Sequence, residues 1–250
     1  MTTRRAARAP VPLPFDERGG LVVLLDPGRS TPDDARMLAA RAARDGACGF
    51  LVGDSLGARE NVAEHVAAIR RGAPRLPIVQ FPASADDLTP EVDAVLFLML
   101  LSGRNPRYLI DEQVRAAPFF DRYPAVRAVS TAYLLVDGGR ESSVEHVSRT
   151  APLPADDADL VAAHVKAGQL IGMHVTYLEA GSGATQPVSA RVIRAARAAT
   201  EGPLMVGGGI TTATLAREAR DAGADYVVVG SLFERDPETD MQPIAAAARA

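Results

Sequence analysis

The sequence contains one cysteine, Cys48, no tryptophan, and a single lysine, Lys166, among its 27 basic residues. One thiol can form neither an internal disulfide nor a CxxC metal site, which favours a reducing compartment. An enzyme that works through a Schiff-base lysine would have Lys166 as its one candidate. Because Lys166 lies within a helical pattern between Ala162 and Leu170, we interpret it as part of a solvated helix face.

Long apolar runs and blocks of one charge are also missing. No apolar run reaches the roughly 18 residues that a membrane-spanning helix needs, and the first residues lack the apolar core of a signal peptide. The net charge is −4, and the only basic block is the N-terminal group Arg4, Arg5 and Arg8. We therefore expect a soluble, cytoplasmic protein with no transmembrane segment and no nucleic-acid partner.

What the sequence does contain is an alternation of apolar runs and helical patterns along its 250 residues, 47% of which are hydrophobic. The apolar runs are continuous, as in strands that are covered on both faces. Eight such runs predict an α/β fold, a single (β/α)8 TIM barrel over residues 21–250 after an N-terminal tail over residues 1–20. The predicted strands are 21–25, 48–52, 77–81, 94–101, 126–136, 175–178, 204–206 and 226–229. An open Rossmann-type sheet is the runner-up, weakened because no G-x-G-x-x-G follows the first strand.

Some helix boundaries follow from capping signals. Thr31 as the N-cap, Pro32 at the first position and Gly46 after the last residue predict a helix over 32–45. The apolar spacing from Pro187 onward predicts another helix that begins there. The segment 142–154 has no clear period, and we expect it to be a longer loop.

Polar residues and glycines follow the predicted strands, at the end where a barrel of this kind places its active site. They are Asp26 after the first strand, Ser55 after the second, Glu179 and Gly181–Gly183 after the sixth, Gly207–Gly209 after the seventh, and Gly230-Ser231 after the eighth. Glycines let backbone N–H groups approach an anion closely, and a following helix N-terminus adds partial positive charge. The glycine turns after the sixth, seventh and eighth strands therefore predict phosphate binding.

The segment Tyr177-Leu178-Glu179-Ala180-Gly181-Ser182-Gly183 resembles the signature of the geranylgeranylglyceryl phosphate synthase family, which includes bacterial heptaprenylglyceryl phosphate synthases. This heptapeptide is specific. Weaker pieces follow in the family's order: Asp26-Pro27, Val52-Gly53-Asp54-Ser55, Ser102–Ile110, Val206–Ile210 and Val229–Ser231. The resemblance covers residues 21–233.

The resemblance implies a Mg²⁺-dependent prenyltransferase. Such an enzyme joins a polyprenyl diphosphate, here most simply geranylgeranyl diphosphate, to the 3-hydroxyl of sn-glycerol 1-phosphate, and it releases diphosphate to form the first ether bond of an ether lipid. By position, Asp26 and Ser55 would hold Mg²⁺, and Glu179 would be the general base. The substrate-binding residues would be Tyr177, Leu178, Glu179, Ala180, Gly181, Ser182, Gly183, Gly207, Gly208, Gly209, Gly230 and Ser231. The resemblance also implies a homo-oligomer and peripheral contact with a membrane for the lipid product.

Two positions depart from the family pattern. Asp54 stands where glycine is usual, and Leu24 stands where some bacterial members have a lysine. Two other functions stay open from the residues alone, because a barrel does not fix chemistry. One is a phosphosugar lyase or isomerase, and the other is a barrel that binds a phosphometabolite without catalysis.

Overall fold

The computed structural model describes residues 13–53, 62–236 and 238–249. Its strands form one closed parallel barrel in which each strand pairs with the next along the chain. The barrel closes because the last strand pairs with the first, with Val229 opposite Val23. This closure confirms the predicted (β/α)8 barrel and excludes the open sheet. The strands are β1 (Gly20–Leu25), β2 (Gly49–Val52), β3 (Ile78–Gln80), β4 (Ala94–Leu100), β5 (Arg127–Leu135), β6 (Val175–Glu179), β7 (Leu204–Gly207) and β8 (Tyr226–Val229).

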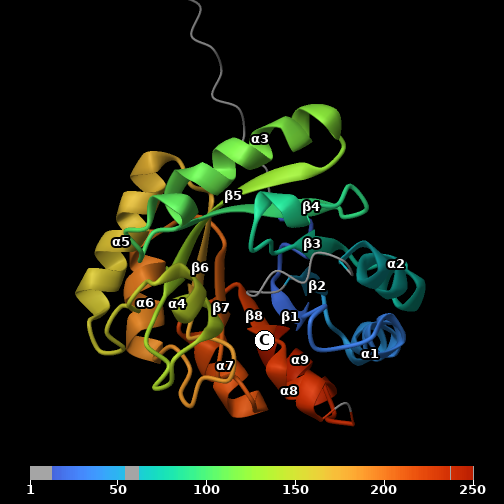
Figure 1. The fold of residues 1–250 in the computed structure, drawn as a ribbon. Coiled ribbons are helices and arrows are strands. Elements are labelled where there is room, and N and C mark those ends of the chain that lie inside the picture. The colour runs from blue at the N-terminus through green and yellow to red at the C-terminus, as the bar shows by residue number, and fades with distance from the viewer. Residues whose placement is uncertain (1–12, 54–61, 237, 250) are drawn as a thin grey trace, which may run out of the picture.

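Helices surround the strands (Figure 1). α1 (Pro32–Asp45) packs against α2 (Val62–Gly72), and α5 (Ala158–Ile171) packs against α6 (Ala190–Ala199). The other helical segments are η1 (Ala85–Asp87), η2 (Arg107–Asp111), α3 (Glu112–Arg122), α4 (Ser143–Ser148), α7 (Ala213–Asp221), α8 (Ser231–Arg235) and α9 (Gln242–Arg249). Of these, η2 is a π-helix that runs directly into α3.

α1 begins and ends at the residues that its caps predict. The Thr31 side chain accepts a hydrogen bond from the backbone N–H of Asp34, and the Asp34 carboxylate accepts one from the backbone of Thr31. Gly46 follows the helix with φ of +99°, in the left-handed region where glycine carries no Cβ penalty. The predicted helix over 32–45 is confirmed.

The expectation of a loop over residues 142–154 was wrong. This segment contains α4, which is closed at its start by a reciprocal capping box between Ser142 and Glu145. A helix of six residues is too short to show a 3.6-residue apolar period, so the periodicity could not reveal it. The Ser-x-x-Glu spacing is the signal that could have.

α6 begins at Ala190, three residues later than predicted. Ser189 has extended backbone and accepts a hydrogen bond from the N–H of Val192, so it is the N-cap. The first residue of α6 is therefore seven positions after Gly183. The glycine turn after β6 does not lead directly into a helix N-terminus, contrary to our expectation.

Side chains of the strands alternate between the barrel interior and the layer beneath the helices. On β6, Val175 and Tyr177 belong to the interior cluster, whereas Leu178 belongs to the outer one. Residues 13–20 are the described part of the predicted tail; residues 13–19 adjoin the barrel, and Gly20 is the first residue of β1. Phe15 is buried in the interior cluster, and its ring packs edge-on against Tyr226 at 5.5 Å between centroids. Residues 1–12 lie outside the described part.

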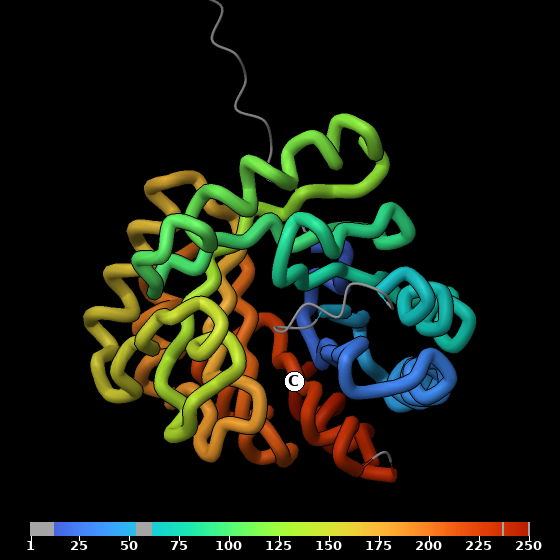
Figure 2. Tube along the Cα trace, viewed as in Figure 1, coloured from blue at the N-terminus to red at the C-terminus, as the bar shows by residue number. Residues whose placement is uncertain are grey.

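The two ends of the described chain meet where the barrel closes. Figure 2 shows the red C-terminal segment beside the blue N-terminal one, and α9 contacts β1. Within the residues that the structure describes, no helix combines the length and apolarity needed to cross a bilayer.

Candidate active site

The alternation along the strands carries two carboxylates to the same end of the barrel. Because Tyr177 faces the interior, Glu179 lies two residues further along the same face, at the carboxyl end of β6. Asp26 follows Leu24 in the same way at the end of β1. Glu179 lines one pocket at this end and Asp26 lines a second pocket beside it.

Glu179 is buried and hydrogen-bonded through both carboxylate oxygens. Its Oε2 accepts a hydrogen bond from the Tyr177 hydroxyl at 2.5 Å, and its Oε1 accepts one from the backbone N–H of Gly181 at 2.9 Å. Burial raises the pKa of Glu179 above its usual value of 4.5, although these two hydrogen bonds lower it. A carboxylate with a raised pKa at a pocket wall is suited to accept a proton from a substrate.

Two glycines let the backbone after β7 pass close to Glu179. A Cβ added at Gly207 would lie 2.8 Å from Oε2 of Glu179, and one added at Gly208 would lie 2.6 Å from Oε1. Gly208 also has φ of +81°, in the left-handed region. Any side chain at these positions would displace the carboxylate, so the glycines are required for the position of Glu179.

The three glycine turns meet around one pocket, which we call the anion pocket. Its polar and glycine lining consists of Glu179, Gly181, Ser182, Gly183, Gly208, Gly209, Thr211, Gly230, Ser231 and Arg235. The hydroxyls of Ser182 and Ser231 lie 2.9 Å apart and connect the turn after β6 to the one after β8. Backbone N–H groups at such turns are the donors that phosphate pockets use. The arrangement suits the phosphate ligand that the sequence predicts.

A mainly apolar pocket adjoins the anion pocket, and we call it the apolar groove. Its lining includes Leu24, Phe81, Pro82, Leu98, Leu100, Tyr108, Tyr133, Val144 and Val147, together with the charged residues Asp26, Arg29 and Glu234. Leu24, Phe81, Tyr133, Val144, Ser182 and Ser231 line both pockets. The two pockets therefore adjoin at these residues, which form the wall that they share, and a ligand in the groove would lie beside a ligand in the anion pocket.

Asp26, the predicted metal ligand, is held by α8 and by its own loop. Its backbone N–H donates to Oε1 of Glu234 at 3.0 Å, and its carboxylate accepts from the N–H of Gly28 at 2.8 Å. The carboxylate also pairs with Arg29 at 3.1 Å, and Arg29 lies 4.0 Å from Glu234. Burial raises the pKa of the Glu234 carboxyl. Glu234 is thus a second acid in the groove, which the sequence analysis did not identify.

Tyr133 is another residue of the site that the sequence analysis missed. Its ring packs against Phe81 and Tyr177, with 5.4 Å between centroids in each case. Its buried hydroxyl has no hydrogen-bond partner among the described residues. Burial, helped by the charge of Glu179, raises the pKa of Tyr133 well above 10, so the phenol keeps its proton. A buried phenol at the shared wall is a donor available to a substrate.

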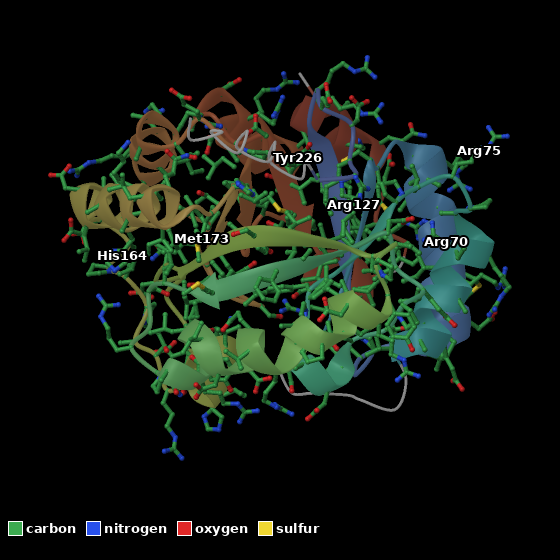
Figure 3. All side chains as sticks on the ribbon, turned by 90° about the horizontal axis from the view of Figure 1, so that it is seen from above. Arg70, Arg75, Arg127, His164, Met173 and Tyr226 are labelled. Atoms are coloured by element: carbon green, nitrogen blue, oxygen red, sulfur yellow. The ribbon has the colours of Figure 1, made fainter. Side chains whose placement is uncertain are left out.

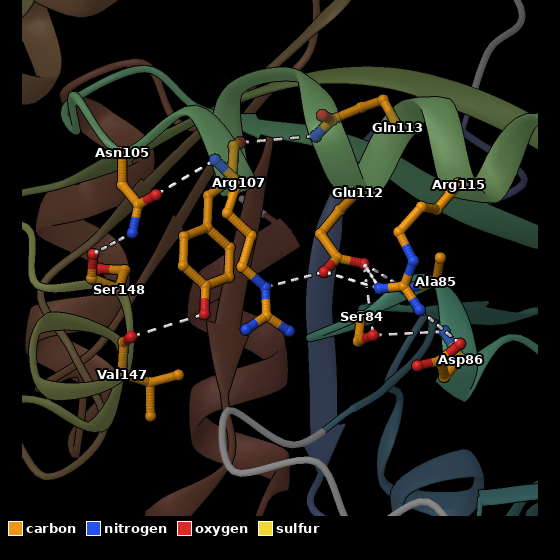
Figure 4. Close-up of polar contacts among 11 residues, drawn as sticks. Ser84, Ala85, Asp86, Asn105, Arg107, Glu112, Gln113, Arg115, Val147 and Ser148 are labelled. Carbon is orange, nitrogen blue, oxygen red and sulfur yellow. Dashed lines mark hydrogen bonds and ion pairs between the residues drawn. The ribbon is translucent and has the colours of Figure 1, made fainter.

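One wall of the apolar groove is anchored by Glu112 at the start of α3 (Figure 4). The Glu112 carboxylate accepts hydrogen bonds from Nε of Arg107, from Nη1 of Arg115 and from the backbone N–H of Ala85, each at 2.9 Å. These contacts tie η2 and α3 to η1, the segment after β3. Tyr108 lies on η2 and lines the groove, so Glu112 fixes the backbone that carries it.

No histidine is among the described residues that line either pocket. His164 lies on the outside of α5, at the edge of the molecule opposite to Arg70 and Arg75 (Figure 3), and its Nδ1 bonds the carbonyl of Leu160. His65 contacts the carbonyl of Ser30 through Nε2 at 2.7 Å. Among the described residues, no three or more His, Cys, Asp or Glu side chains form a group that could hold a metal ion.

Most predicted site residues line one of the two pockets, but four of the described ones do not, namely Tyr177, Leu178, Ala180 and Gly207. Leu178 and Ala180 point into the layer beneath the helices, so their side chains do not line the anion pocket. The N–H of Ala180 is also engaged, since it donates to the carbonyl of Gly207 at 3.0 Å. Ser55 and Asp54 lie outside the described residues.

The model of the PcrB family matches residues 15–248. The chain belongs to the PcrB family. The geranylgeranylglyceryl phosphate synthase of Flavobacterium johnsoniae is 40% identical over 216 residues, which cover 86% of this chain and 88% of that protein. The enzyme of the same name from Spirosoma linguale is 41% identical over 221 residues, which cover 88% of each chain.

A solved structure extends the PcrB-family assignment to the fold. The crystal structure of (S)-3-O-geranylgeranylglyceryl phosphate synthase from Thermoplasma acidophilum, in complex with its substrate sn-glycerol-1-phosphate, matches with a TM-score of 0.86 at 29% identity. The match covers 92% of this chain and 93% of that one. The family resemblance carried by the heptapeptide at 177–183 is therefore confirmed.

Proposed function

We propose that this PcrB-family protein transfers a prenyl group from a polyprenyl diphosphate, such as geranylgeranyl diphosphate, to the 3-hydroxyl of sn-glycerol 1-phosphate. One observation carries the proposal: the anion pocket that contains Glu179 shares a wall with the apolar groove. A phosphorylated polar acceptor and a long apolar donor need two such pockets in contact. The names of the relatives, and the substrate bound to the Thermoplasma acidophilum enzyme, agree with this assignment.

The chemistry follows from the position of Glu179. Its carboxylate takes the proton of the acceptor hydroxyl, whose oxygen forms a bond to C1 of the prenyl chain. The bond between C1 and the diphosphate oxygen breaks, and diphosphate leaves with the electron pair. Tyr177 holds one Glu179 oxygen in place through its hydroxyl.

We also propose that the enzyme uses Mg²⁺, held by Asp26 with Ser55. The residues present fit this ion, because Asp26 and Glu234 supply carboxylate oxygens to one groove, and Mg²⁺ binds through few protein groups plus phosphate oxygens. When bound, the ion would neutralise the charge of the diphosphate. The contribution of Ser55 lies outside the described residues and rests on the family resemblance.

The remaining expectations, a cytoplasmic homo-oligomer with peripheral membrane contact, stay proposals. Exposed apolar side chains on two outer helices support association with a second surface: Val114 on α3, and Leu170 and Ile171 at the end of α5. Light scattering coupled to size-exclusion chromatography measures the oligomeric state, and a monomer at all concentrations would contradict that part.

The test of the function is a direct assay. The purified protein is incubated with sn-glycerol 1-phosphate, Mg²⁺ and prenyl diphosphates of several chain lengths, and diphosphate release is measured together with the mass of the product. We expect diphosphate only when both substrates are present, and a product whose mass is that of the prenyl ether. The absence of turnover with every chain length would exclude the proposed reaction.

A matched pair of variants then assigns the base. Glu179→Gln keeps the shape of the side chain but cannot accept the proton, so turnover should fall by about 10²- to 10⁴-fold. Binding of glycerol 1-phosphate, measured by calorimetry, should largely persist. Glu218→Gln changes an exposed acid on α7 and should be fully active. Full activity of Glu179→Gln would remove Glu179 from the role of base.

A further inference from the structure

The anion pocket contains one residue with a cationic side chain among its described lining residues, and this residue is Arg235. Arg235 is the last residue of α8, and its side chain is exposed. No ion pair involves Arg235 within the described part of the chain, although its charge acts on the neighbouring Glu234. Its guanidinium group has no acidic partner within ion-pair distance there and faces a pocket built from glycine turns.

α8 borders both pockets and directs one acidic and one basic side chain to different pockets. Glu234 lines the apolar groove and bonds the N–H of Asp26, whereas Arg235, the next residue, lines the anion pocket. Consecutive residues on a helix point about 100° apart, because one turn contains 3.6 residues. Glu234 is therefore directed to the proposed metal side, and Arg235 is directed to the proposed phosphate side.

The turn after β6 leaves room for this guanidinium. A Cβ added at Gly183 would lie 2.9 Å from Nη2 of Arg235, which is closer than real Cβ contacts allow. Gly183 also has φ of +76°, where glycine is favoured. The same Cβ would lie 3.7 Å from Nη1 of Arg140, a second guanidinium near this turn. The guanidinium group of Arg235 therefore lies next to the Gly-Ser-Gly turn, close to the position that a Cβ at residue 183 would take.

We propose that Arg235 binds the phosphate group of the acceptor and makes the enzyme select phosphorylated glycerol. This inference rests on the proposed function and identifies the side chain that supplies positive charge to the anion pocket. A guanidinium group stays charged at all working pH values and presents paired donors that match phosphate oxygens. Backbone N–H groups alone orient a phosphate but carry no full charge, so Arg235 supplies the charge preference. Arg29, on the groove side, is already paired with Asp26 and does not line the anion pocket.

The experiment measures binding without turnover. Glycerol 1-phosphate is titrated calorimetrically into the wild-type protein and into Arg235→Gln, Arg235→Lys and Arg140→Gln, with neither Mg²⁺ nor prenyl diphosphate present. Loss of a charge-assisted pair should weaken binding about 10- to 100-fold in Arg235→Gln. The affinity of Arg235→Lys for glycerol 1-phosphate should lie between those of Arg235→Gln and the wild type, because lysine keeps the charge but lacks the paired donors of a guanidinium group. Arg217→Gln, an exposed arginine on α7, is the matched control and should bind as the wild type does.

Two further readouts separate this role from a structural one. Inorganic phosphate should raise the melting temperature of the wild type and of Arg217→Gln, and should raise that of Arg235→Gln much less. In steady-state assays, the KM for glycerol phosphate should rise in Arg235→Gln while the KM for the prenyl diphosphate stays unchanged.

The proposal is overturned if Arg235→Gln binds glycerol 1-phosphate as tightly as the wild type, or if Arg140→Gln shows the larger loss. An equal rise of both KM values would also overturn it, because it would indicate a disturbed α8. Wild-type protein that binds glycerol 1-phosphate through Arg235 but shows no turnover would refute the proposed reaction alone.

Discussion

The hydroxyl of Tyr177 donates to Oε2 of Glu179 across 2.5 Å, inside a barrel that buries both side chains. Burial raises the pKa of Glu179, and this hydrogen bond opposes the rise because it stabilises the ionised form. Tyr177 is therefore a positioning residue that also adjusts the basicity of the carboxylate.

Removing this hydroxyl should move the pH profile of the enzyme. In Tyr177→Phe, the pKa of Glu179 should rise further, because a contact that lowers it is lost while burial remains. A base acts only when deprotonated, so the acidic limb of the profile of turnover against pH should shift to higher pH. Tyr133→Phe leaves this hydrogen bond intact and should leave the limb in place. A shift to lower pH in Tyr177→Phe would contradict the assignment of Glu179 as the base.

A side chain at position 208 should disrupt the site, whereas an alanine side chain at position 172 should be tolerated. A Cβ at Gly208 would lie 2.6 Å from Oε1 of Glu179 and within 2.9 Å of two backbone nitrogens. Gly172 has a similar φ of +100°, yet nothing lies within 4 Å of its Cβ position. Gly172→Ala should therefore lose about 1 to 2 kcal/mol of unfolding free energy, from backbone strain alone. Gly208→Ala should lose more and also lose turnover, as urea unfolding and the diphosphate assay would measure. Equal losses of unfolding free energy in Gly172→Ala and Gly208→Ala would show that the close approach of residue 208 to Glu179 is unimportant.

Glu234 should affect the metal requirement and leave the acceptor site unchanged. In Glu234→Gln, the amide oxygen can still accept from Asp26, but one negative charge leaves the groove. We expect a several-fold higher Mg²⁺ concentration for half-maximal activity. Calorimetric binding of glycerol 1-phosphate without Mg²⁺ should not change. An unaltered Mg²⁺ dependence would show that the charge of Glu234 does not reach the ion.

Glu112 should stabilise the wall of the groove in a pH-dependent way. Burial raises the pKa of Glu112, but its hydrogen bonds to Ala85 and Arg107, together with the charge of Arg115, outweigh burial, and the net shift is downward. A lowered folded-state pKa contributes stability above the unfolded value and loses it as the pH falls through the folded value. Glu112→Gln should therefore cost about 1 to 2 kcal/mol near pH 7, with a smaller difference at pH values well below the ordinary glutamate pKa of 4.5. Glu91→Gln, at an exposed acid, is the control for urea unfolding at both pH values.

The strands were predictable from the sequence because buried parallel strands are continuous apolar runs between polar turns. The glycine turns and Glu179 were predictable for the same reason, since each directly follows such a run. Glu234, Arg235 and Tyr133 were not, because their roles depend on distant segments. Glu234 meets Asp26 across 208 positions of sequence, a contact that exists only because β8 pairs with β1.

Local signals failed in a different way. α4 was missed because a six-residue helix shows no period, and α6 was placed too early because Val188 fits the apolar spacing of the residues after it. In both places the N-cap, Ser142 or Ser189, specifies the boundary more sharply than the apolar pattern does.

The wall common to both pockets limits how the substrate range of this protein can evolve. Leu24, Phe81, Tyr133 and Val144 line both pockets, so under the proposed function a substitution at any of them should alter the fit of donor and acceptor together. Residues that line only one of the two pockets do not couple the two substrates in this way. Under the proposed function, substitutions at Tyr108 and Val147 should change the preferred tail length, and substitutions at Thr211 the preferred head group, without altering the other substrate's pocket.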